Sequence, residues 1–112
     1  MNVKKPVLPI TMISINANTV GPGGYTVINP DGLDEACVII RIINRCKDDM
    51  TVSFDGATAH DYIKSDGEMQ IPAPFQVDQS GFRKLTKVYV KGTQSTGLIH
   101  LCGYYQPVAD KI

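Results

Sequence analysis

Residues 38–56 constrain the fold more than any other part of the chain. They open with an apolar, largely β-branched run, VIIRII, and return after a charged elbow as MTVSFD, in which apolar and polar residues alternate strictly. β-branched side chains suit a pleated sheet, and a period of two places Met50, Val52 and Phe54 on one face of a strand. The pattern predicts two strands joined by a polar loop, a hairpin that forms the core of the fold and whose first strand is covered on both faces.

Short strand patterns separated by turn residues continue along the rest of the chain. Further candidate strands lie at residues 7–16, 25–28, 68–71, 75–77, 86–91 and 98–105, and residues 57–63 are expected to cross back over the sandwich. About eight short strands, regular turns and no amphipathic helix are typical of a sandwich or barrel. We predict an all-β fold, an antiparallel β-sandwich. Its expected buried residues are Ile40, Ile42, Val52, Phe54, Val88, Val90, Ile99 and Leu101.

Length and charge narrow the class of protein. A chain of 112 residues is expected to form one domain, residues 1–112. The formal net charge is zero and charged residues make up 20% of the chain, which argues against nucleic-acid binding driven by bulk charge and favours self-association. The first twelve residues carry two lysines and two prolines, unlike a signal peptide, and no apolar run is long enough for a membrane span. We therefore expect a protein that is not secreted and does not enter a membrane.

The three cysteines are expected to be free thiols. Cys37 and Cys46 flank the first strand of the predicted hairpin, and nine extended residues would separate them by roughly 30 Å, far beyond disulfide reach. Cys102 lies in the last strand. A zinc site needs closely spaced pairs of ligands, which this pattern lacks. No metal or cofactor is therefore predicted.

No constellation of residues predicts catalysis. His60 and Asp61 are adjacent, with Ser53 and Thr58 nearby, but no nucleophile motif surrounds them. The acidic residues lack the spacing of a calcium loop. We predict that the chain is not an enzyme.

Residues 1–15 are the first candidate for a contact with another protein. Their lysines and prolines resist docking as an internal strand, whereas their apolar residues are too numerous to remain in water. They are interpreted as an arm that contacts another subunit, or alternatively as an ordinary first strand that completes the same sandwich. A cationic cluster near residue 84 could bind an acidic partner, or it could prevent a strand edge from pairing with other chains. The candidate interface residues are Leu8, Ile10, Met12, Tyr62, Phe82, Arg83, Lys84 and Tyr105.

Two strings of residues 42–105 contain a recognisable order of motifs: INRCKDDMTVSFDGATAHDYI and, later, VYVKGTQSTGLIHLCGYY. The motifs are Asn44, the VSFDG segment at residues 52–56, His60-Asp61-Tyr62, the VYVKG segment at residues 88–92, and a closing strand that ends in Gly-Tyr-Tyr. In these elements the chain resembles a group of small virion proteins of tailed bacteriophages. Residues 1–36 carry no such resemblance.

The resemblance implies that the predicted sandwich is jelly-roll-like. It also implies a structural role in a virion, most of all that of a capsid decoration (cement) protein. It implies contacts with the major capsid protein or other virion proteins, assembly in the cytoplasm of a bacterial host, and a homo-oligomer, either dimer or trimer. Neither nucleic acid nor membrane is an expected partner. The alternatives are a head–tail or tail-associated adaptor and a carbohydrate- or receptor-binding module. Copy number per particle separates a cement protein from an adaptor, and glycan binding by the isolated protein identifies a binding module.

Overall fold

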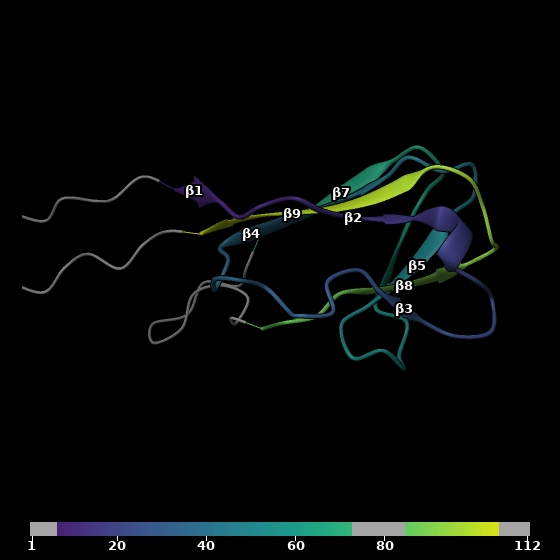
Figure 1. Cartoon of the computed structure of the whole chain (residues 1–112), viewed down its shortest axis with the longest axis horizontal. Coiled ribbons are helices and arrows are strands. Elements are labelled where there is room, and N and C mark those ends of the chain that lie inside the picture. Colours follow the sequence, from purple (N-terminus) through teal and green to yellow (C-terminus); the bar gives the residue numbers. More distant parts are fainter. Residues whose placement is uncertain (1–6, 73–84, 106–112) are drawn as a thin grey trace, which may run out of the picture.

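The chain folds as two antiparallel β-sheets packed face to face, as seen in a computed structural model that describes residues 7–72 and 85–105 (Figure 1). The first sheet contains β1 (Leu8–Pro9), β2 (Ile13–Asn16), β4 (Ile39–Asn44), β7 (Glu68–Pro72) and β9 (Leu98–Tyr105). The second sheet contains β3 (Thr26–Val27), β5 (Met50–Ser53), β6 (Asp61–Ile63) and β8 (Tyr89–Gly92). One turn of 3-10 helix, η1 (Ala17–Thr19), follows β2. Within the described residues, no helix is long and apolar enough to cross a membrane.

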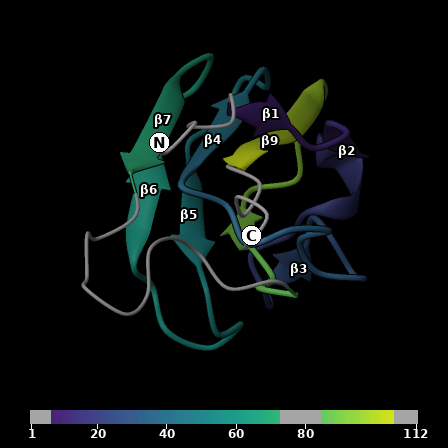
Figure 2. The same cartoon turned by 90° about the vertical axis from the view of Figure 1, so that its left-hand side faces the viewer.

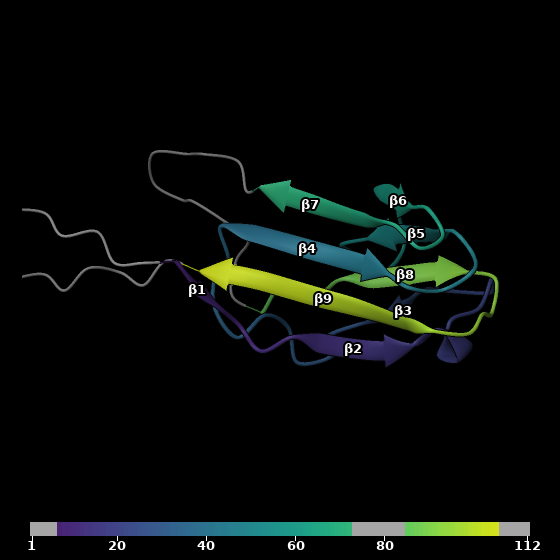
Figure 3. The same cartoon turned by 90° about the horizontal axis from the view of Figure 1, so that it is seen from above.

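The strand order is that of a jelly roll. In the first sheet β1 and β2 share one edge, where both pair with β9, and the order continues through β4 to β7 (Figure 3). The second sheet has the order β3, β8, β5, β6. Figure 2 shows β6 and β7 on one side of the sandwich and β2 and β3 on the other. When β1 and β2 are counted as one interrupted strand, eight strands form two Greek keys, so the predicted jelly-roll-like sandwich is confirmed.

The prediction that residues 38–56 form a hairpin at the centre of the fold is wrong. β4 lies between β9 and β7, whereas β5 lies between β8 and β6 in the opposite sheet. β4 is also covered on one face only, because Ile40 and Ile42 are buried while Ile39, Arg41 and Ile43 are half-buried on the outer face. Period-two alternation reports which face of a strand is apolar, but it does not report which strand lies beside it.

The same topology places β8 and β9 in different sheets, although they follow one another along the chain. It also corrects one further expectation. Residues 57–63 do not cross the sandwich, because β6 turns back and pairs with β5, with Tyr62 opposite Thr51. The candidate strand at residues 75–77 lies outside the described residues.

The core is built as the alternation predicts, with one exception. Seven of the eight expected side chains are buried: Ile40, Ile42, Val52, Val88, Val90, Ile99 and Leu101. Phe54 is only half-buried and packs against the core from its margin, so its predicted burial is wrong. The reason is that β5 ends at Ser53, and the backbone leaves the sheet before the alternation would turn Phe54 inward.

The N-terminal segment from Leu8 onward completes the chain's own sandwich. Leu8 pairs with Tyr105 in β9, and Ile13 pairs with Leu101. Pro9 lies on this edge strand, where a missing amide proton costs no bond within the sheet. For residues 8–16 the structure therefore supports the first-strand alternative over a free arm, while residues 1–6 lie outside the described residues.

The three thiols are free, as expected. Cys37 and Cys46 are buried, and burial raises the pKa of the Cys37 thiol, with a further contribution from Glu35. Cys37 packs against Gly103 in β9, where a Cβ atom would lie 2.8 Å from Cys37 Sγ. Glycine at position 103 thus makes room for the thiol inside the sandwich.

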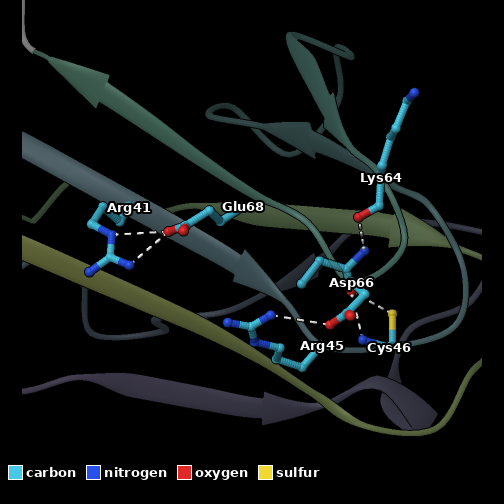
Figure 4. A network of polar contacts seen from close by, with 7 residues as sticks. Arg41, Arg45, Cys46, Lys64, Asp66 and Glu68 are labelled. Carbon is cyan, nitrogen blue, oxygen red and sulfur yellow. Dashed lines mark hydrogen bonds and ion pairs between the residues drawn. The ribbon is translucent and has the colours of Figure 1, made fainter.

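A buried asparagine holds the corner at which the chain passes from β4 toward β5. Asn44 Nδ2 donates to the carbonyl oxygens of Asp48 at 2.9 Å and Lys64 at 3.2 Å, and Asn44 Oδ1 accepts from the backbone N–H of Cys46 at 3.1 Å. Close by, Arg45 Nη1 lies 3.2 Å from Asp66 Oδ1 (Figure 4). One side chain therefore joins the end of β4, the following elbow and the turn after β6.

Replacing this asparagine should destabilise the fold. We expect Asn44→Ala to lower the free energy of unfolding by about 2–3 kcal/mol, because it leaves buried carbonyl and N–H groups without partners. The matched control is Asn18→Ala, at an exposed asparagine whose backbone N–H and C=O form hydrogen bonds that the substitution retains. Urea unfolding of both variants measures the difference. A loss below about 0.5 kcal/mol for Asn44→Ala, the size of an ordinary surface change, would contradict this role.

Candidate functional site

The β1–β2 edge of the first sheet presents both open backbone and apolar side chains. The N–H groups of Ile10 and Ala17 donate to the carbonyls of Gly103 and Gly97, so the backbone groups of alternate residues point away from β9. Within the described residues, no strand lies beyond this edge (Figure 3). Leu8 and Met12, 39% and 53% exposed, lie along it. The edge can therefore accept another extended chain.

The structure brings together only part of the predicted interface. Leu8, Met12 and Tyr105 lie at the β1–β2 edge or on its neighbour β9. Ile10 is buried in the chain's own core and packs against Gly103, so its assignment to an interface is corrected. Its burial follows from the β-pairing that places its N–H on β9.

The other predicted interface residues do not join this edge. Tyr62 is exposed but lies on β6, at the opposite side of the second sheet (Figure 2). Phe82, Arg83 and Lys84 lie outside the described residues. One contact surface cannot contain both Tyr62 and the β1–β2 edge.

The loop after β5 is organised around Asp55. Asp55 Oδ1 accepts from the backbone N–H groups of Thr58 at 2.7 Å and Ala57 at 2.8 Å, and from Ser53 Oγ at 2.9 Å. These bonds, those from Thr58 and Ala57 first, hold the pKa of the Asp55 carboxyl well below its usual range. Gly56 lies against the ring of Tyr89 with φ of 79°, so the loop folds back on the outer face of the second sheet.

The same loop brings together a serine, an aspartate and a histidine in an order that does not activate a nucleophile. A catalytic triad needs the imidazole between the hydroxyl and the carboxylate. Here Ser53 Oγ donates directly to Asp55, and His60 Nδ1 accepts from the backbone N–H of Phe54 at 3.0 Å. His60 Nε2 is 4.0 Å from Asp55 Oδ2. The arrangement stabilises a turn, as its hydrogen bonds to backbone groups indicate.

An ion pair on the outer face of the first sheet was missed by the sequence analysis. Arg41 in β4 donates to Glu68 Oε2 from Nε at 3.2 Å and from Nη2 at 2.7 Å (Figure 4). The bonds from Arg41 lower the pKa of Glu68, and the pair borders a hollow that Tyr104 of β9 also lines. The sequence signal was a lone arginine within an apolar run, but its partner is 27 positions away and is identified only by the pairing of β4 with β7.

Among the described residues, no group of three or more histidine, cysteine, aspartate or glutamate side chains is placed to hold a metal ion. The two histidines have other partners. His60 bonds to the backbone of Phe54, and His100 Nδ1 lies 2.7 Å from Ser14 Oγ on the neighbouring strand β2.

Comparisons with known proteins leave the family open. No model of a known protein family matches the chain, and no curated protein matches it. A solved structure of a Bacillus endospore appendage, from a family of disulfide-linked pili, is similar over 96% of this chain and 95% of that chain. Its sequence identity is 14% and its TM-score is 0.48, a likeness too distant to support a conclusion about function.

The hydrogen bonds of Asp55 make the loop sensitive to acid. Because the folded state lowers the pKa of this carboxyl, its contribution to stability is complete above the ordinary aspartate value of about 3.9 and is lost progressively as the pH falls from that value through the lowered folded-state pKa. We expect the amide chemical shifts of Ala57 and Thr58, measured by NMR, to stay constant from neutral pH to well below about pH 4 and to change only as the pH approaches the lowered pKa of the folded-state carboxyl. Asp55→Ala should abolish their native positions at neutral pH, whereas Asp31→Ala, in an exposed turn, should leave them unchanged. Native shifts in Asp55→Ala would show that the carboxylate does not order the loop.

Proposed function

We propose that this chain is a structural component of a tailed-phage virion, of the capsid decoration (cement) class, and that it acts through protein–protein contacts. The observation that carries the proposal is the β1–β2 edge, beyond which no strand lies among the described residues and along which Leu8 and Met12 are exposed. The resemblance of residues 42–105 to small tailed-phage virion proteins supports a virion as the assembly to which the chain belongs.

The physical basis of such a contact is strand addition. An extended segment of a neighbour forms main-chain hydrogen bonds with an open sheet edge, and apolar side chains beside the edge add burial at roughly 25 cal/mol per Å². The zero net charge of the chain leaves little repulsion between copies. The proposed neighbours are a second copy, in a dimer or trimer, and the major capsid protein or another virion protein. Repetition of a weak contact over a symmetric particle then provides avidity.

A single lysine on the edge tests the contact. Met12→Lys places a charge among the apolar side chains of the edge, and lysine is a residue by which sheet edges avoid pairing. The matched control is Tyr62→Lys, which adds the same charge at a similarly exposed position, 56% against 53%, on β6 of the other sheet. We expect the native protein and Tyr62→Lys to self-associate in light scattering coupled to gel filtration, and Met12→Lys to be monomeric. Equal association by all three proteins would exclude this edge as the contact.

Copy number tests the place of the chain in a virion. Quantitative mass spectrometry of purified phage particles should find the chain in many copies, as expected of a protein that decorates the whole shell. A number that fits one ring would instead identify a head–tail or tail adaptor. Absence of the chain from particles would refute a virion role altogether.

A further inference from the structure

The outer face of the first sheet contains an open hollow of about 690 Å³. Its lining side chains come from three adjacent strands: Ile39 and Arg41 from β4, Glu68 and Gln70 from β7, and Tyr104 from β9. The strand register explains why they converge, because Arg41 lies opposite Gln70 and Ile39 lies opposite Tyr104. A volume of this size lies within the range of small-molecule sites, about 300–1,000 Å³.

The ion pair in this hollow has bonding capacity left. Arg41 directs its bonds from Nε and Nη2 at Glu68 Oε2, so Glu68 Oε1 takes no part in them (Figure 4). Arg41 also interacts with Tyr104, but Nη1 carries two N–H groups, so at least one of them remains available to a ligand. The side chains of Arg41 and Glu68 are 31% and 49% exposed. A ligand in the hollow would therefore meet a strong acceptor and a strong donor side by side.

The neighbouring side chains add complementary groups. The Gln70 side chain is exposed and its amide both donates and accepts hydrogen bonds. The Tyr104 side chain interacts with the Arg41 guanidinium, and its ring, with Ile39, provides an apolar part of the lining. Half-buried apolar surface beside paired donors and acceptors matches a ligand that has both C–H faces and hydroxyl groups.

Charge selects among such ligands. Arg41 and Glu68 together carry no net charge, so an anion at Arg41 is repelled by the neighbouring Glu68, and a cation at Glu68 is repelled by the neighbouring Arg41. A neutral polyhydroxy ligand meets neither repulsion, because adjacent hydroxyl groups can donate to Glu68 Oε1 while they accept from Arg41 Nη1. We propose that this hollow, bounded by Arg41, Glu68, Gln70 and Tyr104, is a binding site for neutral saccharides.

This site is separate from the β1–β2 edge and does not depend on the proposed assembly. β9 lies between the edge strands and the β4–β7 pair that carries Arg41, Glu68 and Gln70. A monomeric chain can therefore bind a saccharide, and a saccharide-free subunit can still assemble.

An NMR titration of the full-length protein tests the proposal. The probes are maltohexaose, cellohexaose and chitohexaose, three neutral oligosaccharides of different linkage or sugar. At least one should shift the amide signals of Arg41, Gln70 and Tyr104 at millimolar concentration. Gln70→Ala, an exposed change that spares the ion pair, should weaken binding roughly 3–10-fold, as expected for the loss of one or two hydrogen bonds. The control Tyr62→Ala removes an exposed ring on the other sheet and should bind as the native protein does.

Three results would overturn the proposal. The first is that none of the three saccharides shifts signals from this face. The second is that shifts map to the face that carries Tyr62, or that Tyr62→Ala weakens binding as much as Gln70→Ala does. The third is tighter binding of an acidic oligosaccharide, trigalacturonate, which would show that the site selects an anion. Circular dichroism of Gln70→Ala confirms that any loss of binding occurs in a folded protein.

Discussion

The hydrogen-bond ladders on both sides of β9 are the interaction on which the rest of the structure depends. β9 pairs with β1 and β2 along one side and with β4 along the other, so it joins the N-terminal strands to the remainder of the first sheet. Leu8 pairs with Tyr105, which means that almost the whole chain must be in place before this sheet is complete. Such long-range pairing makes jelly rolls slow to fold, because loop-closure entropy is lost before the contacts that offset it are formed.

Buried asparagines hold the segments that connect the two sheets. Asn44 binds the elbow after β4 and the turn after β6. Asn29 does the same at the other end of the second sheet: its Nδ2 donates to the carbonyl of Thr86, and its Oδ1 accepts from the N–H of Val88. Each amide supplies the donors and acceptors that a neighbouring strand would otherwise provide. Among the described residues, every buried polar side-chain atom has a hydrogen-bond partner.

The arrangement leaves two surfaces on the first sheet with different chemistry. The edge at β1 and β2 has open backbone and exposed apolar side chains, which suits another polypeptide. The outer face of β4, β7 and β9 has an ion pair beside half-buried apolar groups, which suits a small neutral ligand. Because β9 lies between them, one surface can be occupied without covering the other. A subunit held in an assembly by its edge would still present its sheet face to solvent.

The sequence by itself determined the fold class and most of the core. Alternation at Val52, Val90 and Ile99 indicates which side of each strand is buried, since the side-chain period of a strand is two. Only the tertiary structure decided which strands are neighbours. Neither the division of β4 and β5 between two sheets nor the pairing of Arg41 with Glu68 can be derived from spacing, because both depend on contacts between distant segments. The candidate site was less predictable than the core: burial is set by each strand's own pattern, whereas a surface site is set by the register of several strands at once.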